Sequence, residues 1–239
     1  MSILSALTGG NGGNKEDVIL YAPEYMDLLE RYFLRGNKSG GGCLGGKKLI
    51  TDNEYYNMVM QRKAQIRPYE RALGYLGIDD SSVQEIPPVE FEGFVRGVES
   101  PLSVTRPIRP VLRGYSGLYT NIYEDTWFFF TESQILIYQL TFDMLSRSIK
   151  DESREIFYKD VTSFAVLDLS EEVDHLSTKK GCMGTKVINT KGIDKFMTFR
   201  VVVPGEDSDN LDYVMTANRD LSSKIHAMKQ KLREKKNFS

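Results

Sequence analysis

The chain has 239 residues, of which 41% are hydrophobic and 27% are charged, and its formal net charge is −2. This composition supports a folded core and excludes wholesale disorder. A near-neutral chain also lacks the basic field typical of nucleic-acid binders, so we expect no nucleic-acid partner.

The N-terminal residues 1–16 are predicted to form a flexible arm, because residues 8–14 read TGGNGGN. A short apolar patch at residues 3–7 either docks on the body of the protein or belongs to a disordered end. The patch lacks the basic start and long apolar centre of a signal peptide, and no apolar run of 18 residues occurs. The two cysteines, Cys43 and Cys182, do not make a disulfide framework, which favours a reducing compartment. We therefore expect a cytoplasmic protein.

Residues 17–100 are predicted to form a helical region followed by a connector. One helix begins near Pro23, which suits the first helical position, and a glycine-rich loop over residues 36–46 follows it. A second helix begins at Thr51, because Thr51 and Glu54 match the capping box, in which each side chain binds a free amide of the first turn.

Prolines and polar segments divide the middle of the chain. Pro68 interrupts the second helix, and residues 79–88 form a polar connector. Residues 89–95 alternate between apolar and other side chains, as a lone strand would. Residues 101–114 contain three prolines, which excludes a central strand. These signals place a domain boundary near residues 100–115.

The C-terminal half, residues 115–239, is predicted to contain about seven antiparallel strands, because apolar runs rich in Tyr, Phe, Ile and Val alternate with short polar breaks. A long loop is predicted over residues 171–184. A helix is predicted from Ser208 or Asp209 to about Lys235. The strands are expected at residues 118–123, 127–131, 134–142, 154–158, 161–169, 185–190 and 195–203. The apolar stripe of the helix is Leu211, Val214, Leu221, Ile225, Met228 and Leu232.

Several strands followed by one long amphipathic helix resemble the pleckstrin-homology-like (PH-like) fold. The segments WFFFT at residues 127–131, ILIY at 135–138 and EIFYKDVTSF at 155–164 are similar to the bacterial subtype of that family. The similarity covers about residues 115–235 and leaves the first hundred residues unexplained. The residues that match the family signature are Tyr158, Asp160, Val161, Thr162, Ser163 and Phe164.

The resemblance implies an α+β protein in which an N-terminal helical region precedes a PH-like antiparallel β-barrel that is capped by a C-terminal helix. It also implies a binding module without catalysis. Eukaryotic members of the family often bind phosphoinositides or peptides, and bacterial members tend to assemble into oligomers. The signature itself reads as structural, since its aromatic residues alternate as buried strand residues do.

No residue pattern predicts a catalytic, cofactor or metal site. Gly41, Gly46 and Lys47 resemble a phosphate-binding loop, but Lys48 stands where such a loop needs Ser or Thr. His175 lies in an acidic stretch without a second histidine or cysteine at metal-ligand spacing. We therefore expect no cofactor and no enzymatic activity, and an enzyme is the last of the alternatives.

Basic residues gather before the predicted barrel and at the end of the last helix, and they are candidate contacts for an anion or a partner. In phosphoinositide-binding relatives the anion sits near the loop between the first two strands, which is read here as the acidic Glu124-Asp125. We therefore expect protein–protein association, including self-association into a homo-oligomer. Weak peripheral binding to anionic lipid headgroups is the alternative. The candidate contact residues are Arg106, Arg109, Arg113, Lys229, Lys231 and Arg233.

Overall fold

The computed structural model describes residues 23–33, 49–79, 86–95, 105–108, 117–181, 184–204, 211–215 and 221–237. The arm at residues 1–16 and the glycine-rich loop at residues 36–46 lie outside these residues. The helices are α2 (Pro23–Leu28), η1 (Leu29–Phe33), α3 (Asp52–Ile66), α4 (Pro68–Leu76), η3 (Tyr158–Asp160) and α5 (Leu221–Asn237). The strands are β1 (Val89–Phe94), β2 (Thr105–Ile108), β3 (Gly117–Thr120), β4 (Ile122–Phe130), β5 (Gln134–Asp143), β6 (Ile149–Phe157), β7 (Ser163–Gly181), β8 (Gly184–Val202) and β9 (Leu211–Met215).

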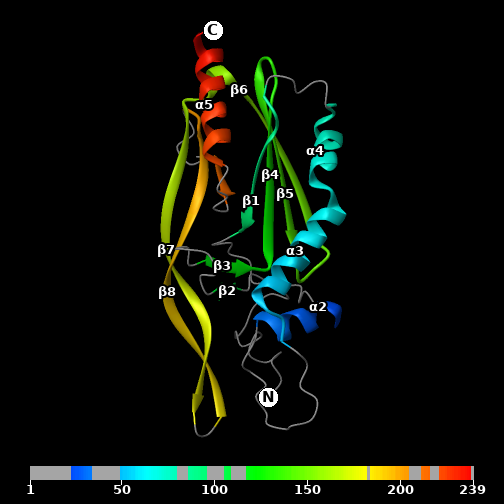
Figure 1. Cartoon of the computed structure of the whole chain (residues 1–239), viewed down its shortest axis with the longest axis vertical. Helices are drawn as coiled ribbons and strands as arrows, with labels where there is room; N and C mark the ends of the chain where they lie inside the picture. Colours follow the sequence, from blue (N-terminus) through cyan, green and yellow to red (C-terminus); the bar gives the residue numbers. More distant parts are fainter. Residues whose placement is uncertain are drawn as a thin grey trace, which may run out of the picture.

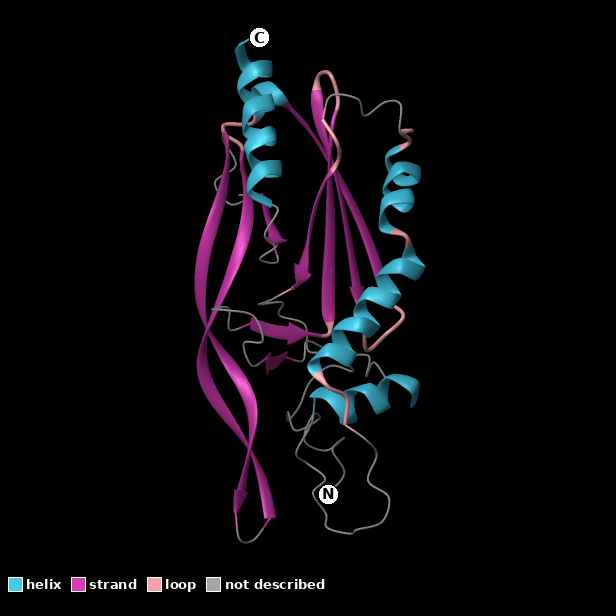
Figure 2. Ribbon diagram, viewed as in Figure 1, coloured by secondary structure: helices cyan, strands magenta, loops and turns pink. Residues whose placement is uncertain are grey.

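The chain is a mixed helix-and-strand fold with antiparallel sheets and a C-terminal helix, which confirms the expected α+β class (Figures 1 and 2). Four strands form one sheet in the order β1-β4-β5-β6, and three form another in the order β7-β8-β9. β2 and β3 make a separate two-stranded sheet. Among the residues that the structure describes, these sheets do not join into the closed barrel that was predicted.

Strand β1 is not the lone strand that its alternation suggested, because it pairs with β4 along its whole length. This pairing joins residues before the expected boundary at 100–115 to strands that follow it. Separate folding of residues 17–100 and 115–239 stays a prediction, and the pairing of β1 with β4 argues against it.

Strand β4 runs without a break through Glu124 and Asp125, so the prediction of two strands separated at this acidic pair is wrong. Both side chains are buried. The strand lies in the middle of the sheet, where both faces are covered, and apolar residues surround the acidic pair on either side. An acidic pair usually marks a turn, which is why the sequence alone misplaced it.

The second sheet also differs from the prediction. Residues 171–181 belong to β7, which pairs with β8 as a long hairpin, so most of the loop expected at residues 171–184 is strand. Figure 1 shows the far half of this hairpin extending away from the rest of the fold. Leu211 and Val214 lie in β9, so they do not begin the last helix. Leu211, Tyr213 and Met215 are buried in alternation, which is the period of a strand.

Helix α5 confirms the second half of the predicted apolar stripe. Leu221, Ile225, Met228 and Leu232 are all buried, at spacings of three and four residues. They pack with apolar residues from both sheets into a first core. Other members of this core are Phe91, Phe128, Ile156, Phe199 and Tyr213.

The N-terminal helices cover the opposite face of the four-stranded sheet and form a second core there. The capping box is present, since Thr51 Oγ1 accepts from the Glu54 amide and Glu54 accepts from the Thr51 amide. Arg67 takes a left-handed conformation between α3 and α4, and Pro68 begins α4, as the interruption predicted. None of the described helices is long and apolar enough to cross a membrane.

Candidate functional site

Three carboxylates gather around one lysine between α3 and the four-stranded sheet. Glu90 and Glu92 are two residues apart on β1 and therefore share a face, and Asp125 lies opposite Glu92 on β4. Lys63 reaches them from α3: its Nζ contacts Glu90 Oε1 and lies 2.5 Å from Glu92 Oε2 and 3.0 Å from Asp125 Oδ2. Tyr123 Oη donates to Glu92 over 2.7 Å. We call Lys63, Glu90, Glu92 and Asp125 the lysine–carboxylate cluster.

Burial decides the charge states within this cluster. Asp125 is fully buried, and this burial raises its pKa to about 8, against the opposing attraction of Lys63. Burial alone would lower the pKa of Lys63, but attraction to Asp125 and Glu92 outweighs it and raises that pKa above its ordinary value. Lys63 is therefore a permanent cation at neutral pH and not a nucleophile.

The carboxylate oxygens lie within 4.8 Å of one another, a spacing that would suit a hard divalent cation. The Lys63 ammonium contacts all three carboxylates and takes the role that such a cation would have. The arrangement thus fastens α3 to the sheet. The sequence held a weak signal for it in the acidic positions of β1 at residues 90 and 92, but nothing local connected them to Lys63.

Glu124 is buried on the other face of β4. Its Oε1 accepts from the Val214 amide and from Thr126 Oγ1, each over 3.3 Å, so it bonds the four-stranded sheet to β9. Burial raises the pKa of this carboxyl. Glu124 and Asp125 are interior residues of β4. The prediction that they form an acidic loop between the first two strands is therefore wrong.

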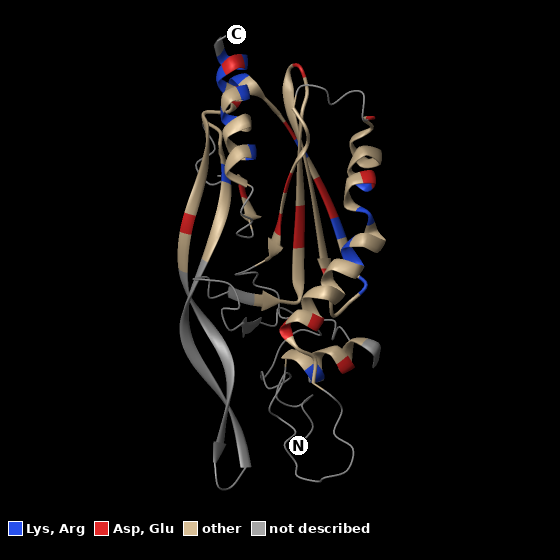
Figure 3. Cartoon of the chain, in the orientation of Figure 1, with Lys and Arg blue, Asp and Glu red and all other residues tan. Residues whose placement is uncertain are grey.

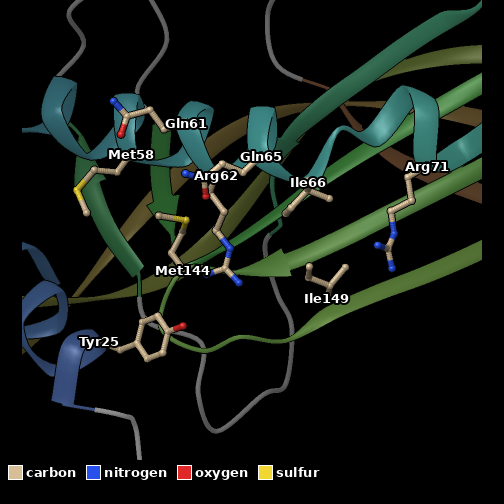
Figure 4. Close-up of a pocket in the computed structure, with 9 residues that line it drawn as sticks. All are labelled: Tyr25, Met58, Gln61, Arg62, Gln65, Ile66, Arg71, Met144 and Ile149. Atoms are coloured by element: carbon tan, nitrogen blue, oxygen red, sulfur yellow. The ribbon is translucent and has the colours of Figure 1, made fainter.

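A surface pocket of about 620 Å³ opens where α3 meets the beginning of β6 (Figure 4). Arg62 points into it, with its guanidinium carbon 5.6 Å from the ring centre of Phe142. Arg71 binds Asp151 of β6 through two bonds of 2.6 Å, and Tyr138 Oη donates to the same carboxylate. The lining residues are Tyr25, Met58, Gln61, Arg62, Gln65, Ile66, Arg71, Met144 and Ile149.

Strand β6 forms an edge of the four-stranded sheet and pairs only with β5 among the described residues. Seven of its nine residues are exposed. Two of these are large and apolar: Ile149 is 37% exposed at the start of the strand, and Phe157 is 48% exposed at its end. A long edge with exposed apolar residues is an open pairing surface.

The predicted contact residues do not form one site. Arg106 lies on β2, whose side chains are not described, and Arg109 and Arg113 lie outside the described residues. Lys229 and Lys231 are half-buried on α5, and Arg233 is exposed there. Figure 1 shows β2 and α5 in different parts of the molecule. Figure 3 shows the Lys and Arg residues spread along α5 towards its C-terminal end.

Comparisons with known proteins add no relative: no family model, no curated protein and no solved structure matches the chain.

Proposed function

We propose that this protein is a non-catalytic binding module that acts through protein–protein association, with a second copy of the chain as its first partner. The observation that carries the proposal is the open edge of β6, where Ile149 and Phe157 are exposed at the two ends of the strand and Ile149 also lines a surface pocket. Edge strands of this kind bind other strands through their free backbone groups. The exposed Met58 and Tyr75 on α3 and α4 add apolar surface.

We also propose that residues 89–237 form a PH-like domain. The four-stranded sheet, then the three-stranded sheet, then an amphipathic helix follow the order that the resemblance implied, with β2 and β3 inserted in the chain between β1 and β4. Tyr158, Val161 and Phe164 from the matching segment are buried in the first core, which fits a structural signature. β1 supplies the first strand of this arrangement, and it comes from before the expected boundary.

Light scattering of the full chain tests association directly. We expect a concentration-dependent mass that approaches twice 27.2 kDa, and a mass near 27.2 kDa for Ile149→Lys combined with Phe157→Lys. The matched control is Leu49→Lys, which changes an apolar residue of similar exposure away from β6. A wild-type mass of 27.2 kDa at every concentration would rule out self-association.

Anionic lipid binding is the second candidate function, and the basic residues at the end of α5 are the feature that supports it. Lys236 Nζ donates to the Thr162 carbonyl over 3.2 Å, and Lys235 lies 5.9 Å from the ring centre of Tyr158. Two of the cations thus contact the body of the protein, which reduces the charge available to a membrane. Flotation with phosphatidylserine vesicles tests this candidate, and we expect only weak binding that is lost as the salt concentration rises.

Enzymatic activity is the third candidate function. A buried carboxylate with a raised pKa, such as Asp125, is common in active sites. Asp125 is already engaged by Lys63, and no residue of the lysine–carboxylate cluster lines the pocket. The cluster therefore supports a structural role better than a catalytic one.

A further inference from the structure

Five of the seven exposed residues of β6 are arranged symmetrically about Ser153, whereas the exposed Lys150 and Glu155 have the buried Ile156 and the half-buried Asp151 at the matching positions. Ile149 and Phe157 lie four residues before and after Ser153, and Glu152 and Arg154 lie one residue before and after it. When a strand pairs with an antiparallel copy of itself, each residue before the centre meets the residue equally far behind it. The pattern of this strand is thus one that a second copy would complement.

We propose that two copies of the chain pair antiparallel through β6, with Ser153 on the twofold axis. This inference rests on the proposed self-association and assigns it a surface and a register. Ile149 of each copy then faces Phe157 of the other, and Glu152 of each faces Arg154 of the other. The dimer would therefore contain two Ile149–Phe157 pairs and two Glu152–Arg154 pairs, and both kinds of cross-strand pair are favourable.

The faces of the sheet are consistent with this register. Ile149 and Phe157 pair within the sheet with Phe142 and Gln134 of β5, and their parity places them on the face that carries α3 and α4. Glu152 and Arg154 have the opposite parity and lie on the other face. Directly opposed residues of an antiparallel pair share a face, so each proposed contact is within reach.

Charges on an edge strand usually discourage pairing. Here they also select the register, because a shift by one residue moves each side chain to the other face and removes both kinds of contact. One kind of opposition is unfavourable and occurs twice, since Asp151 of each copy meets Glu155 of the other. Arg71 offsets it, because its guanidinium already binds Asp151 through two bonds of 2.6 Å. In the single chain, Glu152 Oε1 lies 2.5 Å from Lys150 Nζ. Both side chains are exposed, so Glu152 can also contact Arg154 of the second copy.

The paired strands would join two four-stranded sheets into one continuous sheet. Phe157 of the second copy would pack on Ile149, which also lines the surface pocket (Figure 4). The dimer would therefore cover the apolar rim of that pocket as well as the exposed edge.

Cysteine cross-linking tests the register. In a full-length background with Cys43→Ser and Cys182→Ser, Ser153→Cys places two thiols across the twofold axis, where Cα atoms of opposed residues are about 4.5–5.5 Å apart. That spacing suits a disulfide, so we expect most of the protein to form a covalent dimer on mild oxidation. Glu155→Cys is the matched control on the same face, because its two thiols would lie roughly 14 Å apart along the strands. Cross-linking that is equal for the two variants, or stronger for Glu155→Cys, would overturn the proposed register.

Charge exchange provides the second test. Glu152→Arg places two arginine pairs at the interface, and we expect the dimer dissociation constant to rise at least tenfold in light scattering. Adding Arg154→Glu restores both pairs and should bring the constant back to within threefold of the wild type. A wild-type chain that stays monomeric refutes self-association and this register together. A dimer that neither cross-links through Ser153→Cys nor responds to Glu152→Arg leaves association standing and refutes the β6 surface.

Discussion

Both edge strands of the four-stranded sheet carry charged residues, but these charges have different roles on the two strands. At β1, Glu90 and Glu92 lie under α3 and surround Lys63, so their charges hold two parts of one chain together. At β6, Glu152 and Arg154 are exposed, and their order along the strand suits a second copy of the same strand. The difference is burial: a covered charge must be neutralised within the fold, whereas an exposed charge can also bind a group of another molecule.

The largest effect is expected where the covered charges lose their cation. Lys63→Met should lower the free energy of unfolding by about 3–5 kcal/mol, because Glu90 and Glu92 would lose the ammonium between them and the buried Asp125 would lose the contact with Lys63. Urea denaturation measures the change. Lys150→Met on β6 is the control and should alter stability by less than about 0.5 kcal/mol, since Lys150 is exposed. Equal effects for the two substitutions would contradict the proposed difference between the charges of β1 and those of β6.

The first core is predicted to be the next most sensitive region. Met228→Ala should cost about 2–5 kcal/mol, because Met228 is fully buried between α5 and the two sheets. Thermal denaturation should show a clear fall in melting temperature. The exposed Ser222 on the same helix supplies the control, Ser222→Ala. An unchanged melting temperature for Met228→Ala would mean that α5 does not pack on the sheets.

The pH dependence of stability reports on Asp125. Its folded-state pKa of about 8 lies above its ordinary value of 3.8, so the folded chain keeps a proton that the unfolded chain has lost between these values. The free energy of unfolding should therefore fall as the pH rises from about 4 to 8. Asp125→Asn should reduce this slope, while Ser222→Ala, which changes no titratable group, should leave it unchanged. A slope unaffected by Asp125→Asn would contradict the burial argument.

The smallest effect is expected at the start of α3, the helix that carries Lys63. Thr51→Ala removes the side-chain bond to the Glu54 amide and should cost about 1 kcal/mol. Thr51→Ser keeps the hydroxyl and serves as the control, with stability close to that of the wild type. Urea denaturation resolves the two, and equal losses would show that the cap does not stabilise the helix.

Local patterns predicted the local parts of the fold. The capping box at Thr51 and the apolar stripe of α5 were both found from spacing within a single helix. The far part of β7, residues 171–181, and strand β9 were missed because the first segment is mostly polar and the second is short, and the ladders that form them are not visible in sequence. The pairing of these segments with other strands, and not their local sequence, determines that they form strands.

The lysine–carboxylate cluster could not have been predicted from spacing alone. Lys63 lies 27 residues before Glu90 along the chain, and Asp125 follows on another strand. Only the packing of α3 over β1 and β4 brings them together. The edge of β6 was equally hidden, because sequence does not say which strand ends a sheet, although the symmetry about Ser153 was present in the sequence itself.

Amide hydrogen exchange of the full chain at two protein concentrations tests the contrast between the edges most directly. We predict that protection in β6, residues 149–157, increases as the concentration is raised through the dimer dissociation constant, because the free backbone groups of this edge become paired. Protection in β1 and β4 should not depend on concentration, since their charges and bonds lie within one chain. Protection of β6 that is the same at both concentrations, in a chain that dimerises, would contradict the account.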